Sequence, residues 1–193
     1  MRRYLTLAIV VITAACGRSG TPWHATDITG AMPDLAFQMT RANDDKVVSA
    51  ANYRGKVALL YFGYTHCPDI CPATLANLSD ALAKLGREAI NVRVLFVTVD
   101  PDRDTAPVLA RYVAAFAPEI DGLTGNADAL LRVARRYRVA YQVTPASAGR
   151  PYNVMHSNAV FIFDKRGRAR LVTTSTDDTA AISGDLRRLL DVE

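Results

Sequence analysis

Several features that would place this chain in a particular class are scarce or missing. Only three of its 193 residues are cysteine, so a framework of several disulfides is excluded. The formal net charge is +4, and it falls to +2 when Arg2 and Arg3 near the N-terminus are left out. That charge is too small to indicate nucleic-acid binding. The sequence also has no internal repeat and no low-complexity segment.

What remains is an ordinary globular composition. Half of the residues are hydrophobic and 22% are charged, which is enough apolar material for one sizeable core. One folded domain is therefore expected. The densest basic stretch lies between Arg132 and Arg138 and alternates with apolar residues, a pattern typical of the solvated face of a helix.

The first fifteen residues, MRRYLTLAIVVITAA, have the pattern of a secretory signal. A positively charged start comes first, and an apolar run that is too short to span a bilayer follows it. Small residues then precede Cys16. Ala14 and Ala15 directly before Cys16 resemble the bacterial lipoprotein cleavage box, although Thr13 stands where leucine is usual. We expect Cys16 to be lipidated, because an unpaired exposed thiol is a liability in an oxidising compartment. The alternative is ordinary signal cleavage nearby.

This interpretation divides the chain into three parts. A lipoprotein signal peptide covers residues 1–15, a lipid-anchored tether of small and polar residues covers 16–31, and a folded domain covers 32–193. It predicts an exported bacterial lipoprotein that is anchored to a membrane and faces the periplasm or the cell exterior. Within the domain only Cys67 and Cys71 remain, so these two thiols can pair only with each other.

The two cysteines lie between a predicted strand and a predicted helix. Residues 57–62 (VALLYF) form an apolar run rich in branched and aromatic side chains, the pattern of a strand buried on both faces. After the cysteines, leucines at spacings of three and four indicate an amphipathic helix over 73–86 that Gly86 ends. Pro72 fits the first turn of that helix.

Further along the chain, predicted strands and helices continue to alternate, and a hairpin that turns at Arg166 and Gly167 follows them. This order predicts an α/β three-layer sandwich with a central mixed sheet. The expected elements are strands over 92–99 and 120–123, a helix that Thr105 caps, helices over 127–137 and 179–190, and a loop over 144–155.

The thiols stand at the carboxyl end of a strand and the start of a helix, a frequent place for chemistry in open α/β sheets. The helix dipole and its unpaired N–H groups stabilise thiolate there, so at least one cysteine is expected to ionise more readily than free cysteine. Thiols at this spacing can close a structural disulfide, exchange disulfides, or converge on a soft ion such as copper(I) or zinc. A disulfide closing so small a loop would remove little unfolded-state entropy, yet the spacing leaves all three uses open.

Four segments follow one another along the chain: YFGYTHCPDICPATL, VTVDPDRDT, GLTG and VMHSNAVFIFD. Together they resemble the Sco/SenC family of copper-handling proteins, and the resemblance covers residues 32–193. It implies a thioredoxin-like fold and a role in assembling cytochrome c oxidase, by delivering copper to its binuclear copper centre or by reducing the cysteines of that centre. It also implies that Cys67, Cys71 and His156 bind copper as Cu(I) or Cu(II). The implied partners are the copper-centre subunit of the oxidase and another copper chaperone or a thiol reductant, and the predicted lipid anchor adds the membrane.

The chemistry of the residues supports the histidine. Imidazole with two thiolates suits copper in either oxidation state, because copper(I) accepts three ligands and copper(II) gains a nitrogen donor that it favours. His66, next to Cys67, is expected to face the wrong way to chelate, and His24 is expected at the surface of the tether. Carboxylates suit harder ions, so turn or capping roles are expected for Asp69, Asp100 and Asp102.

One residue departs from the family pattern. Met155 stands immediately before His156, where the family commonly has aspartate, and the missing carboxylate removes an outer-shell partner near a bound cation. We expect Met155 to be a buried side chain rather than a weak sulfur donor. The leading function is a membrane-tethered copper metallochaperone. The alternatives are a thiol-disulfide reductase, with Cys67 and Cys71 as its redox-active pair, and a peroxidase on the same scaffold.

Overall fold

The strand that precedes the cysteines lies at the centre of an eight-stranded mixed sheet. β4 (Val57–Gly63) is buried along its whole length, as its continuous apolar run predicts. The computed structural model describes residues 22–147, 149 and 152–191. From one edge to the other, the strands are β1 (Thr26–Asp27), β10 (Ala169–Thr173), β9 (Val160–Phe163), β4, β5 (Val92–Thr98), β6 (Ile120–Thr124), β2 (Gln38–Arg41) and β3 (Lys46–Ser49).

The middle of this sheet is parallel and its flanks are antiparallel. β4 and β5 pair in parallel, as do β5 and β6, whereas β9 runs antiparallel to β4. β9 and β10 also pair antiparallel, as expected for the predicted hairpin, in which Gly167 has a positive φ of 72°. The carboxyl ends of the parallel strands therefore share one edge of the sheet, and β4 leads from it into the cysteine loop.

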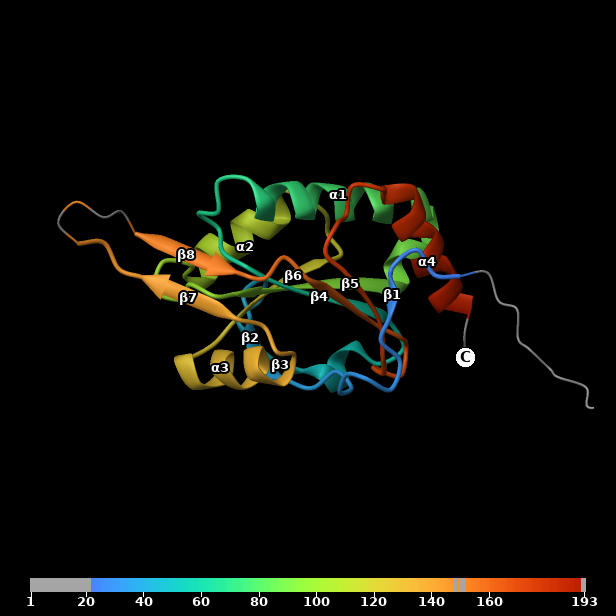
Figure 1. Cartoon of the computed structure of the whole chain (residues 1–193), viewed down its shortest axis with the longest axis horizontal. Helices are drawn as coiled ribbons and strands as arrows, with labels where there is room; N and C mark the ends of the chain where they lie inside the picture. The colour runs from blue at the N-terminus through green and yellow to red at the C-terminus, as the bar shows by residue number, and fades with distance from the viewer. Residues whose placement is uncertain (1–21, 148, 150–151, 192–193) are drawn as a thin grey trace, which may run out of the picture.

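Helices cover both faces of the sheet. α1 (Ile70–Leu85) packs against α4 (Thr179–Asp191) along one face, and α3 (Ala127–Arg136) lies on the other (Figure 1). α2 (Ala106–Ala114) lies on the α1 side, because its Tyr112 ring contacts Phe96, whose ring also packs near Cys71. Two short 3-10 helices, η1 (Ala50–Tyr53) and η2 (Gly86–Asn91), complete the connections. The predicted α/β three-layer sandwich is confirmed.

The local signals that predicted the helices act as expected. α1 starts three residues earlier than predicted, which brings Cys71 into its first turn, and it ends at Gly86 with a φ of 61°. Thr105 is the N-cap residue of α2. The predicted basic face is exposed on α3 and just after it, at Arg132, Arg135, Arg136 and Arg138.

The predicted loop over 144–155 is wrong at its ends, because both belong to a second sheet. β7 (Tyr141–Thr144) and β8 (Asn153–His156) form an antiparallel hairpin in which Tyr141 pairs with His156. This hairpin projects from the end of the molecule at which α1 begins (Figure 1). Its strands are only four residues long, and they lack the continuous apolar runs by which the central strands are recognised.

The folded part of the chain begins before Met32, earlier than the predicted end of the tether. β1 pairs with β10, and Ala25 is buried where its backbone N–H donates to Asp185 at 2.9 Å. The Trp23 ring lies 3.7 Å from the guanidinium carbon of Arg188. The predicted signal peptide and Cys16 lie outside the described residues. None of the helices in the described part of the chain has the length and apolar character needed to cross a bilayer.

Candidate metal centre

The two cysteines and His156 come together at one end of the sheet. Cys67 lies in the loop between β4 and α1, Cys71 in the first turn of α1, and His156 at the end of β8. Their sulfur and nitrogen ligand atoms all lie within 4.8 Å of one another. Cys71 is fully buried and Cys67 is partly exposed. The cysteine loop and a histidine 85 residues after Cys71 therefore supply one compact group of donors.

Hydrogen bonds fix the orientation of the group. The His156 Nε2 atom lies 3.3 Å from the Cys71 Sγ atom, and the Cys71 backbone N–H donates to the Cys67 Sγ atom at 3.4 Å. On the other side of the ring, His156 Nδ1 lies 2.9 Å from the Ser157 carbonyl oxygen. A carbonyl can only accept, so the ring proton sits on Nδ1 and the lone pair of Nε2 faces the sulfurs.

Two tyrosines enclose the group. The Tyr61 hydroxyl donates to the Cys71 Sγ atom at 3.6 Å, and burial raises the pKa of that tyrosine, so its hydroxyl stays protonated. The Tyr64 ring meets the His156 imidazole edge-on, with 5.7 Å between their centroids. These contacts restrict the imidazole to one orientation over the cysteines.

Of the two cysteines, Cys71 is not one that ionises more readily than free cysteine. Burial raises the pKa of the Cys71 thiol to about 12, although the thiol lies in the first turn of a helix. Desolvation of a fully buried sulfur therefore outweighs the favourable helix terminus. Without a cation Cys71 stays a thiol, and a bound metal ion must displace its proton.

Gly63 allows the cysteine helix to approach the sheet so closely. A Cβ atom at this position would lie 2.5 Å from Phe96 Cε2 and 2.8 Å from Cys71 Sγ. Both distances are far below an ordinary contact, so any side chain at the end of β4 would push the ring or the sulfur away. The glycine thus determines how deeply Cys71 sits.

The side chain of Asp104 holds the loop that carries Cys67 by hydrogen bonds to Thr65. This residue was not identified from the sequence. Its carboxylate is fully buried and accepts hydrogen bonds from the Thr65 N–H at 3.0 Å and the Thr65 hydroxyl at 2.6 Å. The Thr98 hydroxyl also donates to it at 2.6 Å. The third aspartate of the DPDRDT segment was the available signal, because that segment directly follows a strand whose carboxyl end adjoins the thiols.

The other histidines lie away from the group. His66 is exposed, and its Nδ1 atom lies 3.0 Å from the Thr65 hydroxyl oxygen rather than among the sulfurs. The expectation that it faces away is confirmed. His24 is exposed as well.

The three candidate aspartates also lie outside the group. Asp69 is the N-cap residue of α1, although its side chain makes no capping hydrogen bond. Asp102 is exposed in the turn after β5. Asp100 is buried and accepts hydrogen bonds from Arg103 and Tyr152. The turn role is confirmed for Asp102, whereas Asp69 occupies the cap position without a capping hydrogen bond from its side chain, and the Asp100 carboxylate binds Tyr152 of a distant segment.

The expected burial of Met155 is wrong. Its side chain is 60% exposed, because side chains alternate along a strand and β8 directs Val154 and His156 toward the domain. Met155 instead lies at the edge of an open cleft of about 400 Å³ that reaches Cys67. The cleft is lined by Tyr64, Cys67, Pro68, Asp69, Ile70, Val154, Met155, His156 and Asn158.

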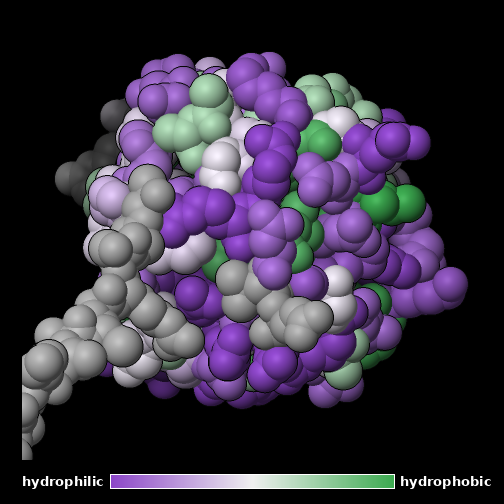
Figure 2. Space-filling view, turned by 90° about the vertical axis from the view of Figure 1, so that its right-hand side faces the viewer, coloured by the Kyte–Doolittle hydropathy of each residue, from purple (hydrophilic) through white to green (hydrophobic). Residues whose placement is uncertain are grey.

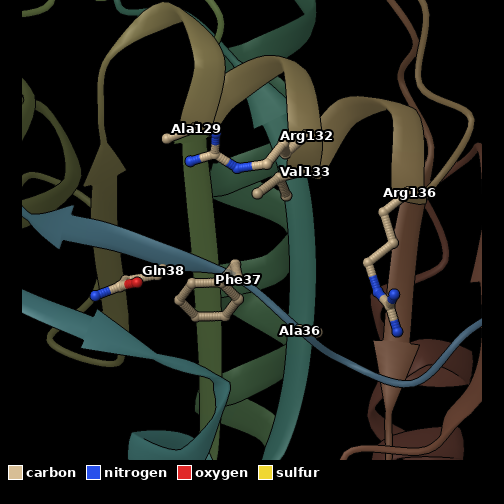
Figure 3. A pocket seen from close by; sticks show the side chains of 7 residues that line it. All are labelled: Ala36, Phe37, Gln38, Ala129, Arg132, Val133 and Arg136. Carbon is tan, nitrogen blue, oxygen red and sulfur yellow. The ribbon is translucent and has the colours of Figure 1, made fainter.

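A second hollow, of about 340 Å³, lies between α3 and residues 36–38 (Figure 3). Arg132 and Arg136 extend from the helix, and the Phe37 ring lies across from them. Arg136 donates to the Asp34 carbonyl oxygen at 2.9 Å. The residues that line this hollow include no thiol, imidazole or carboxylate, so the hollow offers no ligand set for a soft metal ion.

Comparison with known proteins gives one consistent result. The family model SCO1/SenC matches residues 28–191. A cattle relative, "Protein SCO2 homolog, mitochondrial", is 40% identical over 154 residues, which are 75% of this chain and 58% of that protein. A SCO2-like protein of Rickettsia prowazekii is 35% identical over 133 residues, 68% of this chain and 64% of that protein. The match spans 45% to 58% of the length of the cattle, mouse and human relatives.

Solved structures agree with this. ScoI of Bradyrhizobium japonicum with copper bound has a TM-score of 0.74 and 33% identity, and the match covers 82% of this chain and 99% of that one. The apo Sco1 protein of Thermus thermophilus has a TM-score of 0.77 and 33% identity, over 88% of this chain and 98% of that one. With the family model covering nearly all of the described domain, the resemblance seen in the sequence is confirmed: the chain belongs to the SCO1/SenC family.

Proposed function

We propose that this protein is a copper metallochaperone that binds copper through Cys67, Cys71 and His156 and assists assembly of the binuclear copper centre of cytochrome c oxidase. The observation that carries the proposal is the convergence of two thiols and one imidazole within 4.8 Å. Similar structures named as Sco proteins with copper bound give further support.

The donor set suits copper in both oxidation states. Two sulfur ligands favour copper(I), and the imidazole adds the nitrogen donor that copper(II) prefers. Partial exposure of Cys67 leaves the cleft side of the site open to a partner. Thiolates of the oxidase subunit can then replace the three ligands one at a time, and copper(I) passes to the partner without leaving a soft ligand field.

The proposed setting is a membrane surface outside the cytoplasm. A lipid on Cys16, after removal of residues 1–15, anchors the chain at the periplasmic or outer surface of a bacterial cell. The copper-centre subunit of the oxidase is the proposed receiver, and another copper chaperone is the proposed source of the metal.

The alternative function is thiol-disulfide reduction, and the two free, adjacent cysteines favour it. The Cys67 thiolate would attack a disulfide of the partner, forming a mixed disulfide and releasing one partner thiol. The Cys71 thiol, losing its proton, would then close a Cys67–Cys71 disulfide and release the second thiol. Two electrons pass to the partner, and an external dithiol must restore the pair. The raised pKa of Cys71 disfavours its attack on the mixed disulfide.

Substitution of His156 separates the two functions, because disulfide exchange needs no third ligand. His156→Ala should leave the cysteines able to oxidise and reduce each other. It should weaken copper(II) binding by more than the roughly 10- to 100-fold that loss of an outer-shell partner costs. Copper(I) should suffer less, since two thiolates can hold it in linear coordination. Either cysteine changed to Ser should abolish both activities.

The decisive measurement is the amount of functional copper centre in the oxidase of cells grown at limiting copper. His156→Ala should reduce it, excess copper should restore it, and the exposed His66→Ala variant is the matched control. If His156→Ala supports normal assembly at limiting copper while the cysteine variants do not, the reductase function replaces the metallochaperone function.

A further inference from the structure

The segment VTVDPDRDT contains a buried carboxylate that copper binding itself does not use. Asp100, directly after β5, is only 1% exposed. One of its oxygens accepts a hydrogen bond from the Tyr152 hydroxyl at 2.6 Å, and the other accepts one from Arg103 Nε at 2.5 Å. A buried charge is stable only when it is paired and hydrogen-bonded, and these two partners meet that requirement.

Arg103 and Tyr152 also contact each other. The guanidinium carbon of Arg103 lies 3.7 Å from the centroid of the Tyr152 ring and 5.9 Å from that of Tyr64. Desolvation and the hydrogen bond to Asp100 raise the pKa of Tyr152 to about 12, so its hydroxyl stays a donor. Asp100, Arg103 and Tyr152 thus form a closed triangle, which we call the Tyr152 latch.

The latch connects the main domain to the hairpin that carries His156. Tyr152 comes one residue before β8, and His156 ends that strand. The β7–β8 hairpin forms a sheet of its own. Among the described residues, apart from the contact of His156 with the neighbouring Ser157, two side-chain hydrogen bonds join residues 141–156 to the rest of the domain: Tyr152 to Asp100, and Cys71 with His156. The second of these involves the metal ligands, so of the two hydrogen bonds only the one in the latch is independent of the metal, and it adds to the packing of Val154 on the core.

We propose that the Tyr152 latch positions His156 over the cysteines and thereby sets how strongly the site prefers copper(II) relative to copper(I). The inference rests on the proposed copper function. A hairpin that is already held in place loses less conformational freedom when the metal binds. Copper(II) benefits most, because it depends on the imidazole, whereas two thiolates can hold copper(I) without it.

Tyr152→Phe is the sharpest test, because it removes one oxygen atom and leaves the ring and the Asp100–Arg103 ion pair in place. The matched control is Tyr141→Phe. It makes the same change in the same hairpin, and the Tyr141 hydroxyl has no hydrogen bond among the described residues. Affinities of the purified protein for Cu(II) and Cu(I) are measured by competition with chelators of known affinity. Tyr152→Phe should weaken Cu(II) binding about tenfold and leave Cu(I) binding nearly unchanged. The absorption band from thiolate to copper(II) should shift.

A double variant separates positioning from general destabilisation. In a His156→Ala background there is no imidazole to position, so Tyr152→Phe should cause no further loss of Cu(II) affinity. A second loss as large as the first would overturn the proposal, and so would an equal loss of Cu(I) and Cu(II) affinity.

Hydrogen exchange of the metal-free protein tests the latch without copper. The amides of β8 and Ser157 should exchange faster in Tyr152→Phe than in the original protein. Their exchange rates should be unchanged in Tyr141→Phe. Faster exchange in a protein that binds no copper would refute the proposed function while upholding the latch as the hairpin's attachment. Unchanged exchange in a protein that binds copper normally would refute the latch alone.

Discussion

At the scale of single residues, the site gives two identical side chains different properties. Cys71, in the first turn of α1, is buried next to Phe96 and Gly63, and burial raises the pKa of its thiol to about 12. Cys67, four residues earlier, is partly exposed and borders the open cleft. A bound metal ion can therefore have one protected sulfur ligand and one that an incoming partner can reach.

Alkylation should distinguish the two thiols. Because burial raises the pKa of the Cys71 thiol well above 8, Cys71 is almost entirely protonated at pH 8. Its thiolate fraction rises as the pH is raised toward the pKa and falls as the pH is lowered, so alkylation of Cys71 should slow further at lower pH. In the reduced, metal-free protein, iodoacetamide should modify Cys67 well before Cys71, as peptide mass spectrometry can measure. Copper(I) should protect both. Equal rates, or a faster Cys71, would contradict the buried site.

Met155 gives a second prediction at this scale. Its side chain is 60% exposed, so Met155→Leu should change the free energy of unfolding by less than about 0.5 kcal/mol. Copper affinity should stay the same, because leucine keeps the volume and removes only the sulfur. Urea unfolding and chelator competition measure the two quantities. A large fall in copper affinity would instead identify Met155 as a ligand.

At the scale of elements, the site depends on how closely α1 approaches β4. The two elements meet at Gly63, where a Cβ atom would lie 2.8 Å from Cys71 Sγ. The four leucines of α1, which are Leu75, Leu78, Leu82 and Leu85, are all buried. The leucine spacing predicted this buried face correctly. The same spacing carries no information about the distance between the helix and the strand.

Gly63→Ala tests the close approach. The added methyl group must displace the Phe96 ring or the Cys71 sulfur, and overpacking of this kind costs about 1–3 kcal/mol. Urea unfolding of the metal-free protein should show a loss in that range. Gly184→Ala is the control, because no atom lies within 4 Å of the added carbon in α4, so it should stabilise by about 0.5–1 kcal/mol. A Gly63→Ala variant as stable as the original would disprove the tight contact.

At the scale of the whole molecule, the metal group and the described N-terminal segment lie at opposite ends (Figure 1). Arg188 of α4 donates to the Pro22 carbonyl oxygen at 3.1 Å, and its guanidinium lies over the Trp23 ring. The end of the molecule at which α4 and this segment lie has a mostly hydrophilic surface with scattered apolar residues (Figure 2). A chain anchored through Cys16 would thus be attached at the end far from the site.

The anchor itself is the prediction at this scale. Several acyl chains on Cys16 should hold the protein stably to a membrane, since one chain alone gives marginal binding. Labelled fatty acid should co-purify with the protein, and Cys16→Ser should abolish both the label and the membrane attachment. Thr13→Leu, which restores the usual residue of the cleavage box, should keep both. Cys16→Ser protein in the membrane fraction would show that the cysteine is not the anchor.

The sequence by itself determined those features of the protein that depend on local patterns of residues. Continuous apolar runs identified the central strands, leucine spacing and Gly86 identified α1, and the order of elements gave the mixed α/β sandwich. The quoted motifs gave the family and the candidate ligands Cys67, Cys71 and His156. Each of these depends on residues close together in the chain, or on a known pattern of such segments.

Only the tertiary structure decided the environment of those residues. The burial that raises the pKa of Cys71, the outward direction of Met155 and the buried role of Asp104 all come from segments distant in the sequence. The short β7–β8 hairpin escaped detection because its strands are defined by pairing with each other rather than by a buried apolar face. Desolvation and long-range contacts set these properties, and both are fixed only when the whole chain packs.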